Sequence, residues 1–90
     1  MTDREFMELA LIEAGKAYKE GEIPIGAVVV CDGVIVATAH NEKEQRKDPT
    51  AHAEVIALRK AASHLKRWRL TGCTLYVTIE CVLGHCLIPE

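Results

Sequence analysis

The fold of this chain depends on one valine-rich stretch, IGAVVVCDGVIVATA, at residues 25–39. Valine, isoleucine and threonine favour β-strands, and they are abundant on both sides of Asp32-Gly33. An Asp-Gly pair between two such runs is a strong indication of a two-residue hairpin turn. The stretch therefore predicts an antiparallel β-hairpin with Asp32 and Gly33 at its turn.

Apolar residues with the one-face spacing of a helix occur on both sides of this hairpin. Before it, an amphipathic pattern follows a capping-box sequence that starts at Thr2. After residues 41–48, which we interpret as a loop, a second helical pattern runs to about His64. Residues 74–79 have the composition of a third strand, for which we expect a parallel neighbour through the helical crossover. The predicted order is α-β-β-α-β in an α/β fold.

The composition limits the class of protein. A length of 90 residues allows one domain, which we assign to residues 1–90. Apolar residues make up 49% and charged residues 27%, as in an ordinary soluble globular protein. The longest apolar run is too short to cross a bilayer, and the first residues lack the order of a signal peptide. We therefore expect a cytoplasmic protein with no membrane partner.

Basic residues are concentrated between positions 59 and 69, around Trp68. The formal net charge of the chain is −2, so any contact with nucleic acid must use a local basic patch of this kind. Because runs of charge are usually solvated faces, we favour a solvated helix face over an RNA footprint. The basic residues are Arg59, Lys60, Lys66, Arg67 and Arg69.

The four cysteines fall into two groups. Without a secretion signal, metal ligands or inert buried thiols are favoured over disulfides. Cys31 and Cys73 lie in apolar, strand-like segments, and we interpret them as core residues because free cysteine packs like a small hydrophobe. Cys81 and Cys86 follow the third strand and remain candidate ligands.

His52 and Glu54 form the clearest chemical motif, His-x-Glu, near the start of the second helix. A neutral imidazole is a good zinc ligand, and a nearby carboxylate could move protons to and from an activated water. Alone the motif is weak, because a histidine at a helix start is more often a cap or a surface group. Together with Cys81, His85 and Cys86, it predicts a site with three protein ligands and a fourth position open to water.

Several blocks of the sequence, together with Asn41, resemble the tRNA-specific adenosine deaminases of the cytidine deaminase-like superfamily. The blocks are EIPIGAV at residues 22–28, DPTAHAE at residues 48–54 and LTGCTLYVTIE at residues 70–80. The similarity covers about residues 3–80, and guanine deaminases share much of it. The resemblance implies a three-layer α/β/α cytidine deaminase-like fold, which we expect to be incomplete at its C-terminus.

The resemblance also implies a reaction, the zinc-dependent hydrolytic deamination of adenosine to inosine at the tRNA wobble position. It assigns His52 as a zinc ligand and Glu54 as the general acid and base. Asn41 would hydrogen-bond the target base, and Ala53 would contribute backbone to the base pocket. The implied partners are the tRNA anticodon loop and a second copy of the chain in a homodimer.

The sequence departs from the family after Glu80. The family continues Glu-Pro-Cys-x-x-Cys, whereas residues 80–86 read ECVLGHC and place Gly84 where the second thiol belongs. A helical turn there would favour His85 as the third ligand beside Cys81, while a loop would free Cys86, the ligand we assign. We expect impaired activity from this departure. The alternatives are a deaminase of free guanine or cytosine, or a non-catalytic fragment.

Overall fold

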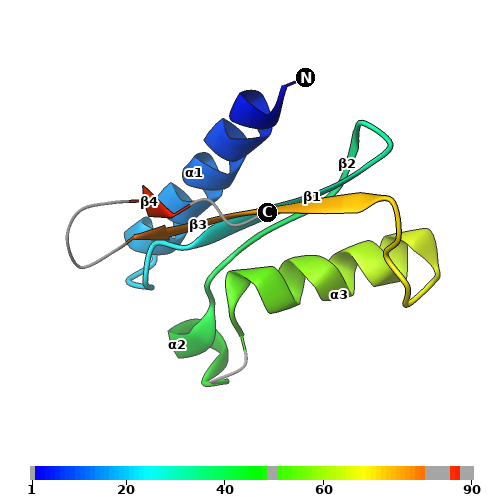
Figure 1. Cartoon of the computed structure of the whole chain (residues 1–90). Helices are drawn as coiled ribbons and strands as arrows, with labels where there is room; N and C mark the ends of the chain where they lie inside the picture. The colour runs from blue at the N-terminus through cyan, green and yellow to red at the C-terminus, as the bar shows by residue number, and fades with distance from the viewer. Residues whose placement is uncertain (1, 49–50, 81–85, 88–90) are drawn as a thin grey trace.

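The computed structural model describes residues 2–48, 51–80 and 86–87. Within these ranges the strands form a sheet of order β2-β1-β3-β4, with α1 on one face and α3 on the other (Figure 1). This arrangement confirms the expected α/β/α layering. The elements are α1 (Asp3–Lys19), β1 (Gly26–Cys31), β2 (Val34–His40), α2 (Lys43–Arg46), α3 (Ala53–Leu65), β3 (Cys73–Glu80) and β4 (Cys86–Leu87).

The β1–β2 hairpin has the turn that its sequence predicts. Cys31 pairs with Val34, which leaves Asp32 and Gly33 as a two-residue loop. Both loop residues have positive φ, 52° for Asp32 and 77° for Gly33, as a type I′ turn requires. Glycine adopts this conformation without a steric penalty, and aspartate tolerates it better than most residues.

The capping box at the start of α1 is also confirmed. The Thr2 side chain accepts a hydrogen bond from the Glu5 backbone, and the Glu5 carboxylate accepts one from the Thr2 backbone at 2.9 Å. These two bonds satisfy amides that a helix start leaves without partners. No helix in the described ranges is both long and apolar enough to cross a membrane.

Strand β1 is one of the two inner strands of the sheet, and all six of its residues are buried. Its side chains alternate between two apolar clusters because both faces of the strand are covered. Val28 and Val30 pack in the cluster under α1, with Phe6 and Tyr76. On the other face, β1 packs with α3 in the second cluster, which includes Ala27, Val29, Ala53, Ile56, Ala57 and Ala61.

Gly26, the first residue of β1, allows α1 to lie directly against the sheet. A Cβ at this position would overlap the carbonyl oxygen of Ala10 and lie 2.8 Å from the Cβ of Glu13. The Gly26 backbone N–H instead donates to the hydroxyl of Thr78 at 3.2 Å. The absence of a side chain therefore sets the spacing between α1 and β1.

The direction of β3 differs from our prediction. We expected a parallel neighbour, but β3 pairs antiparallel with β1, with Gly26 opposite Thr78 and Cys31 opposite Cys73. The crossover through α3 does return the chain in the direction of β2, because both β2 and β3 are antiparallel to β1. The prediction was wrong because β1 lies between the two strands that the crossover connects.

Three further features were not anticipated from the sequence. The polar stretch interpreted as a loop contains the short helix α2. Strand β4 pairs antiparallel with the end of β3, with Glu80 opposite Cys86. Cys31 and Cys73, interpreted as separate core thiols, face each other across β1 and β3 and are joined by a disulfide. Their assignment to the core is confirmed, since Cys31 is buried and Cys73 packs against the α3-side cluster, but the expectation of free thiols was wrong. Cysteine spacing does not reveal the register of two strands.

Candidate active site

One end of the sheet gathers residues that are far apart in sequence. Gly26 pairs with His40 on β2 and with Thr78 on β3, so these three residues form one row across the sheet. Asn41 follows His40 directly, and its backbone N–H donates to the Ile25 carbonyl at 3.1 Å. The strand β3 ends two residues beyond Thr78. The segment after β2 and the end of β3 therefore lie at the same end of the sheet.

Asn41 connects this end of the sheet to the start of α3. Its side-chain oxygen accepts a hydrogen bond from the Ala53 backbone N–H at 3.1 Å, and both residues are fully buried. The neighbouring backbone adds a second link, from the Glu42 N–H to the Ala51 carbonyl at 3.0 Å. Because the first amides of a helix have no partner within it, Asn41 acts as a remote cap for α3.

The Nδ2 atom of Asn41 is buried and has no hydrogen-bond partner among the described residues. The orientation of the amide follows from chemistry, since the Ala53 N–H requires an oxygen and not a second donor. An unpaired donor buried away from water costs free energy, so native proteins rarely leave one without a purpose. The structure therefore presents a fixed, buried hydrogen-bond donor beside the start of α3.

His52, the N-cap residue of α3, and Glu54, in its first turn, flank Ala53, whose backbone N–H bonds to the Asn41 side chain. The His52 carbonyl accepts from the Ile56 N–H at 3.0 Å, but its imidazole makes no capping bond to the helix. Its Nδ1 atom lies 3.6 Å from Oε1 of Glu54, beyond hydrogen-bond distance. The two side chains are 42% and 34% exposed respectively, so both can reach a third group.

The residues assigned to the zinc site are only partly described. Among the described residues, no group of three or more His, Cys, Asp and Glu side chains could hold a metal ion. Cys81 and His85 lie outside the described residues, and only the backbone of Cys86 is placed, opposite Glu80 in β4. An uncapped imidazole at His52 fits a zinc ligand chemically, and the described chain supplies this one donor of the predicted set.

Two polar residues near the site, Glu22 and His40, were not identified as site residues from the sequence. Glu22 is buried, and its carboxylate accepts from the backbone amides of Glu44 and Gln45 at 3.1 and 2.8 Å. His40 lies between two carboxylates, with Nδ1 3.1 Å from Glu13 and Nε2 2.8 Å from Glu20. Glu22 lies in the segment between α1 and β1, and His40 is the last residue of β2, so no hydrophobic period marks either residue. The signal that could have identified them is a polar or charged residue close in sequence to a strand that is expected to be buried.

Glu13 is held as a carboxylate by these contacts. Burial acts to raise its pKa, but hydrogen bonds from Lys16 and His40 outweigh burial and hold the pKa below its ordinary value. The Lys16 ammonium lies 2.7 Å from the Glu13 carboxylate. Conversely, hydrogen bonding to Glu13 raises the pKa of Lys16. The ionised carboxylate is therefore the form that the fold favours.

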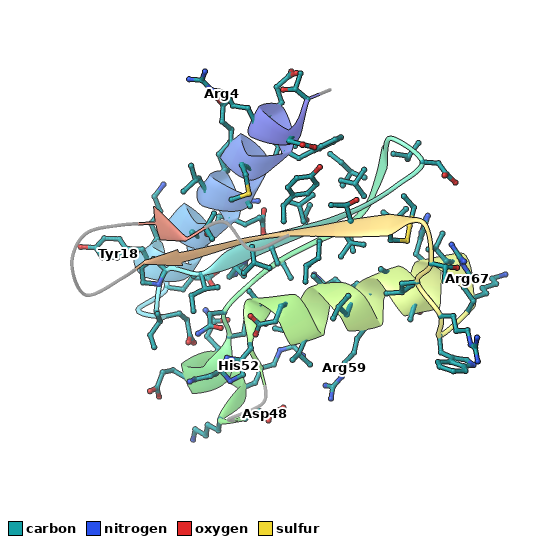
Figure 2. All side chains as sticks on the ribbon, in the orientation of Figure 1. Arg4, Tyr18, Asp48, His52, Arg59 and Arg67 are labelled. Atoms are coloured by element: carbon teal, nitrogen blue, oxygen red, sulfur yellow. A yellow bond between two sulfur atoms is a disulfide. The ribbon has the colours of Figure 1, made fainter. Side chains whose placement is uncertain are left out.

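The basic stretch lies away from the candidate site. Figure 2 shows His52 at one end of α3 and Arg67 beyond the other end. All five basic residues are exposed, as expected for a solvated face. Trp68 is 79% exposed, and the guanidinium of Arg69 lies 4.8 Å from the centroid of its ring.

The sequence matches a known protein family. The family model described as the cytidine and deoxycytidylate deaminase zinc-binding region matches residues 1–87. The chain therefore belongs to the cytidine and deoxycytidylate deaminase family, as its resemblance predicted.

Individual relatives are more specific. The chain is 48% identical over 79 residues to a tRNA-specific adenosine deaminase of Aquifex aeolicus, with 87% of this chain and 52% of that protein covered. It is 49% identical over 78 residues to a tRNA-specific adenosine deaminase of Bacillus subtilis, covering 87% of this chain and 48% of that protein. The chain thus spans about half the length of these curated relatives.

Solved structures show the same fold. A structure from a study of A-to-I editing by tRNA:A34 deaminases superposes with a TM-score of 0.82 at 47% identity, covering 87% of this chain and 60% of that one. The guanine deaminase of Bacillus subtilis also superposes with a TM-score of 0.82, at 41% identity, covering 86% of this chain and 50% of that one.

Proposed function

We propose that this chain carries the base-binding and proton-transfer residues of a tRNA adenosine deaminase. The reaction is the zinc-dependent hydrolysis of adenosine to inosine at the wobble position. The similarity to tRNA-specific adenosine deaminases supports this substrate. The observation that carries the proposal is the buried Nδ2 of Asn41, which has no hydrogen-bond partner in the described part of the chain, beside the His52 and Glu54 motif.

The donor on Asn41 suits a purine. Ring nitrogens of a purine are hydrogen-bond acceptors, and the fixed amide of Asn41 offers them a donor. The segment that precedes β1 provides apolar surface at the same end of the sheet, where Ile23 is 53% exposed. In this proposal the base lies between that segment, Asn41 and the backbone of Ala53.

The proton transfers belong to Glu54. In zinc-dependent nucleobase deaminases as a class, a glutamate that does not bind the metal serves as general acid and base. Zinc, when bound, would activate the attacking water as a Lewis acid. His52, Cys81 and Cys86 would hold the metal, with His85 as the alternative third ligand. Glu54 would then take the water proton and deliver it to the leaving amine.

A guanine deaminase is the second candidate. The matching guanine deaminase fold supports it, and a donor such as Asn41 Nδ2 can serve any purine. The two functions differ in what surrounds the base, because a tRNA substrate presents its adenosine on a structured anticodon loop. We therefore keep free guanine as the competing substrate.

The proposal extends to the setting of the reaction. We propose that residues 1–90 act as one deaminase-like domain in the cytoplasm. A homodimer would complete the surface that receives the anticodon loop. Recognition of a structured loop also explains how the net charge of −2 can accompany an RNA substrate, since base contacts rather than bulk charge would select it.

The test is a direct comparison of substrates. The chain is prepared with added zinc, and inosine formation on a tRNA anticodon stem-loop is measured beside deamination of free guanine. Glu54→Gln provides the matched inactive control. Turnover of the stem-loop alone supports the proposal, and turnover of guanine alone replaces it with the second candidate. Metal-loaded, folded chain that converts neither substrate refutes both and leaves a non-catalytic fragment.

A further inference from the structure

The buried carboxylate of Glu22 connects the two segments between which the base is proposed to lie. It immediately precedes the Ile23–Ile25 segment, yet its side chain bonds to α2, which begins shortly after Asn41. We propose that Glu22 is a positioning residue that fixes the segment carrying Asn41 against the segment carrying Ile23. This inference rests on the proposed function, because it concerns how accurately the base donor is placed.

The contacts of Glu22 are specific in geometry. One carboxylate oxygen lies 3.1 Å from the Glu44 amide nitrogen, and the other lies 2.8 Å from the Gln45 amide nitrogen. These bonds cross 22 and 23 residues of sequence, and Glu22 itself is only 5% exposed. Bonds between an ionised carboxylate and backbone amides are roughly twice as strong as neutral ones. The carboxylate therefore joins two segments that are more than twenty residues apart in sequence.

A second carboxylate strengthens the same junction. Glu20 accepts from the side-chain amide of Gln45 at 2.7 Å and contacts Nε2 of His40 at 2.8 Å. His40 precedes Asn41 directly, while Gln45 lies in α2 just beyond it. Gly21, with a φ of 79°, forms the turn between the two glutamates. The α1–β1 turn thus contacts the chain on both sides of Asn41.

Burial makes this junction stiff. If α2 moved away, the Glu22 carboxylate would remain buried without its amide partners, which is far more costly than a buried neutral group without partners. Asn41 is therefore held by its own bonds to Ile25 and Ala53 and by the restraint on the segment that follows it. A displacement of about 1 Å at a reacting base can reduce catalysis by roughly a hundredfold. In this proposal, catalysis would be sensitive to the position of Asn41 on that scale.

The competing explanation is that Glu22 only stabilises the fold. The two explanations differ in what else changes when the carboxylate is removed. Glu22→Gln has the same shape, but its amide offers one acceptor oxygen to two backbone donors and places an NH₂ group against one of them. Tyr76→Phe is the matched control. Tyr76 belongs to the apolar cluster under α1, and this substitution deletes its part-buried side-chain hydrogen bond to Asp3.

The first measurement is amide hydrogen exchange, which does not depend on activity. In the zinc-loaded wild-type chain the Glu44 and Gln45 amides should be protected. Glu22→Gln should lower the protection factors of these two amides at least tenfold. Tyr76→Phe should not change them by more than its effect on the global free energy of unfolding accounts for. Unprotected Glu44 and Gln45 amides in the wild-type chain would overturn the proposal without any variant being made.

The second measurement is the split between KM and kcat on the anticodon stem-loop. Glu22→Gln should raise KM by roughly tenfold at a temperature where both variants remain folded, because a displaced Asn41 would lose about one hydrogen bond to the base. Tyr76→Phe should leave KM within twofold. Equal KM values for the two variants at matched stability would show that Glu22 is merely structural. If the wild-type chain does not turn over, the proposed function fails, and the exchange measurement alone decides whether Glu22 positions the segment.

Discussion

The side-chain oxygen of Asn41 accepts a hydrogen bond from the backbone N–H of Ala53 at 3.1 Å, across twelve residues of sequence. This bond caps the first turn of α3 and also decides which end of the amide is free to donate. The bond therefore fixes the donor that would hold the base relative to the start of the helix that carries His52 and Glu54. Changes at Asn41 can separate the two roles.

Asn41→Asp should remove the donor while keeping the cap. The aspartate can still accept from Ala53 N–H, but its ionised carboxylate has no donor for a purine nitrogen. We expect KM for the stem-loop to rise at least tenfold, with a smaller change in overall RNA affinity, because base contacts specify and phosphate contacts position. Steady-state kinetics and RNA binding titrations measure both quantities.

Asn41→Ala is the comparison variant, because it removes the donor and the cap together. It should reproduce the kinetic loss of Asn41→Asp and lose the stability typical of a deleted cap, about 1 kcal/mol. Asn41→Asp should lose stability for a different reason, because it places a charge at a fully buried position. Normal kinetics in Asn41→Asp would show that the Nδ2 donor is not used by the substrate.

Glu54→Gln should abolish deamination without removing zinc. The glutamine keeps the size of the side chain but cannot transfer protons, and general acid–base catalysis contributes roughly a hundred- to ten-thousand-fold to rates. Metal analysis of the folded variant should give the same zinc content as the wild-type chain. Loss of zinc in Glu54→Gln would mean that Glu54 is a ligand, and the role assigned to it would be wrong.

The fold was predictable where a local pattern determines the structure. The Asp32-Gly33 turn and the capping box at Thr2 each depend on a few adjacent residues, and both are confirmed. The direction of β3 was not predictable in the same way. It depends on whether β1 or β2 is its neighbour, and no local pattern encodes that choice.

The same distinction between local patterns and long-range contacts applies to the candidate site. His52, Glu54 and Asn41 were identified from sequence motifs and the family resemblance, and the structure brings Asn41 into contact with the start of α3. Glu22 and His40 were missed because their partners are long-range contacts with no periodic trace in the sequence. Their importance became visible only when burial and partner were known together.

The disulfide between Cys31 and Cys73 should make stability depend on redox state. It closes a separation of 42 residues, and disulfides of such loops contribute about 2–4 kcal/mol to folding. Cys73→Ser should therefore lower the free energy of unfolding under oxidising conditions and have a much smaller effect in excess reductant. Urea unfolding in both conditions tests this. An equal loss in both would show that the thiols matter only by packing.

Gly26→Ala should strongly destabilise the chain. The added Cβ would overlap the Ala10 carbonyl oxygen, a backbone atom that cannot move without shifting α1. Overpacking usually costs about 1–3 kcal/mol, and a clash with backbone should reach at least the upper end of that range. Thermal unfolding measures the loss.

Gly15→Ala is the matched control for this substitution. Gly15 lies within α1, and a Cβ there would meet no atom within 4 Å. Replacing a glycine in a helix interior by alanine should stabilise by up to about 1 kcal/mol. If both substitutions had the same sign, the close approach of α1 to β1 would not be what requires glycine at position 26.

Glu13 should make stability fall at acid pH. Burial acts against its ionised form, but bonds from Lys16 and His40 hold its pKa below the ordinary value when the chain is folded. A carboxyl group with a depressed folded pKa stabilises the protein above its unfolded pKa of about 4.3. The contribution is lost as the pH falls through the lower, folded pKa. Stability should therefore decrease on acidification from about pH 5 downwards.

Glu13→Gln should flatten this dependence, because a glutamine does not titrate. The difference in urea midpoint between wild type and Glu13→Gln should be large near pH 6 and shrink steadily towards pH 3. Glu8→Gln is the control, because it removes the same charge from the same helix. Glu8 makes only an exposed pair with Arg4, at 3.7 Å. Exposed pairs contribute little, so Glu8→Gln should follow the wild-type curve closely. A Glu13→Gln difference that stays constant or grows towards acid pH would show that Glu13 is not the carboxylate the fold depends on.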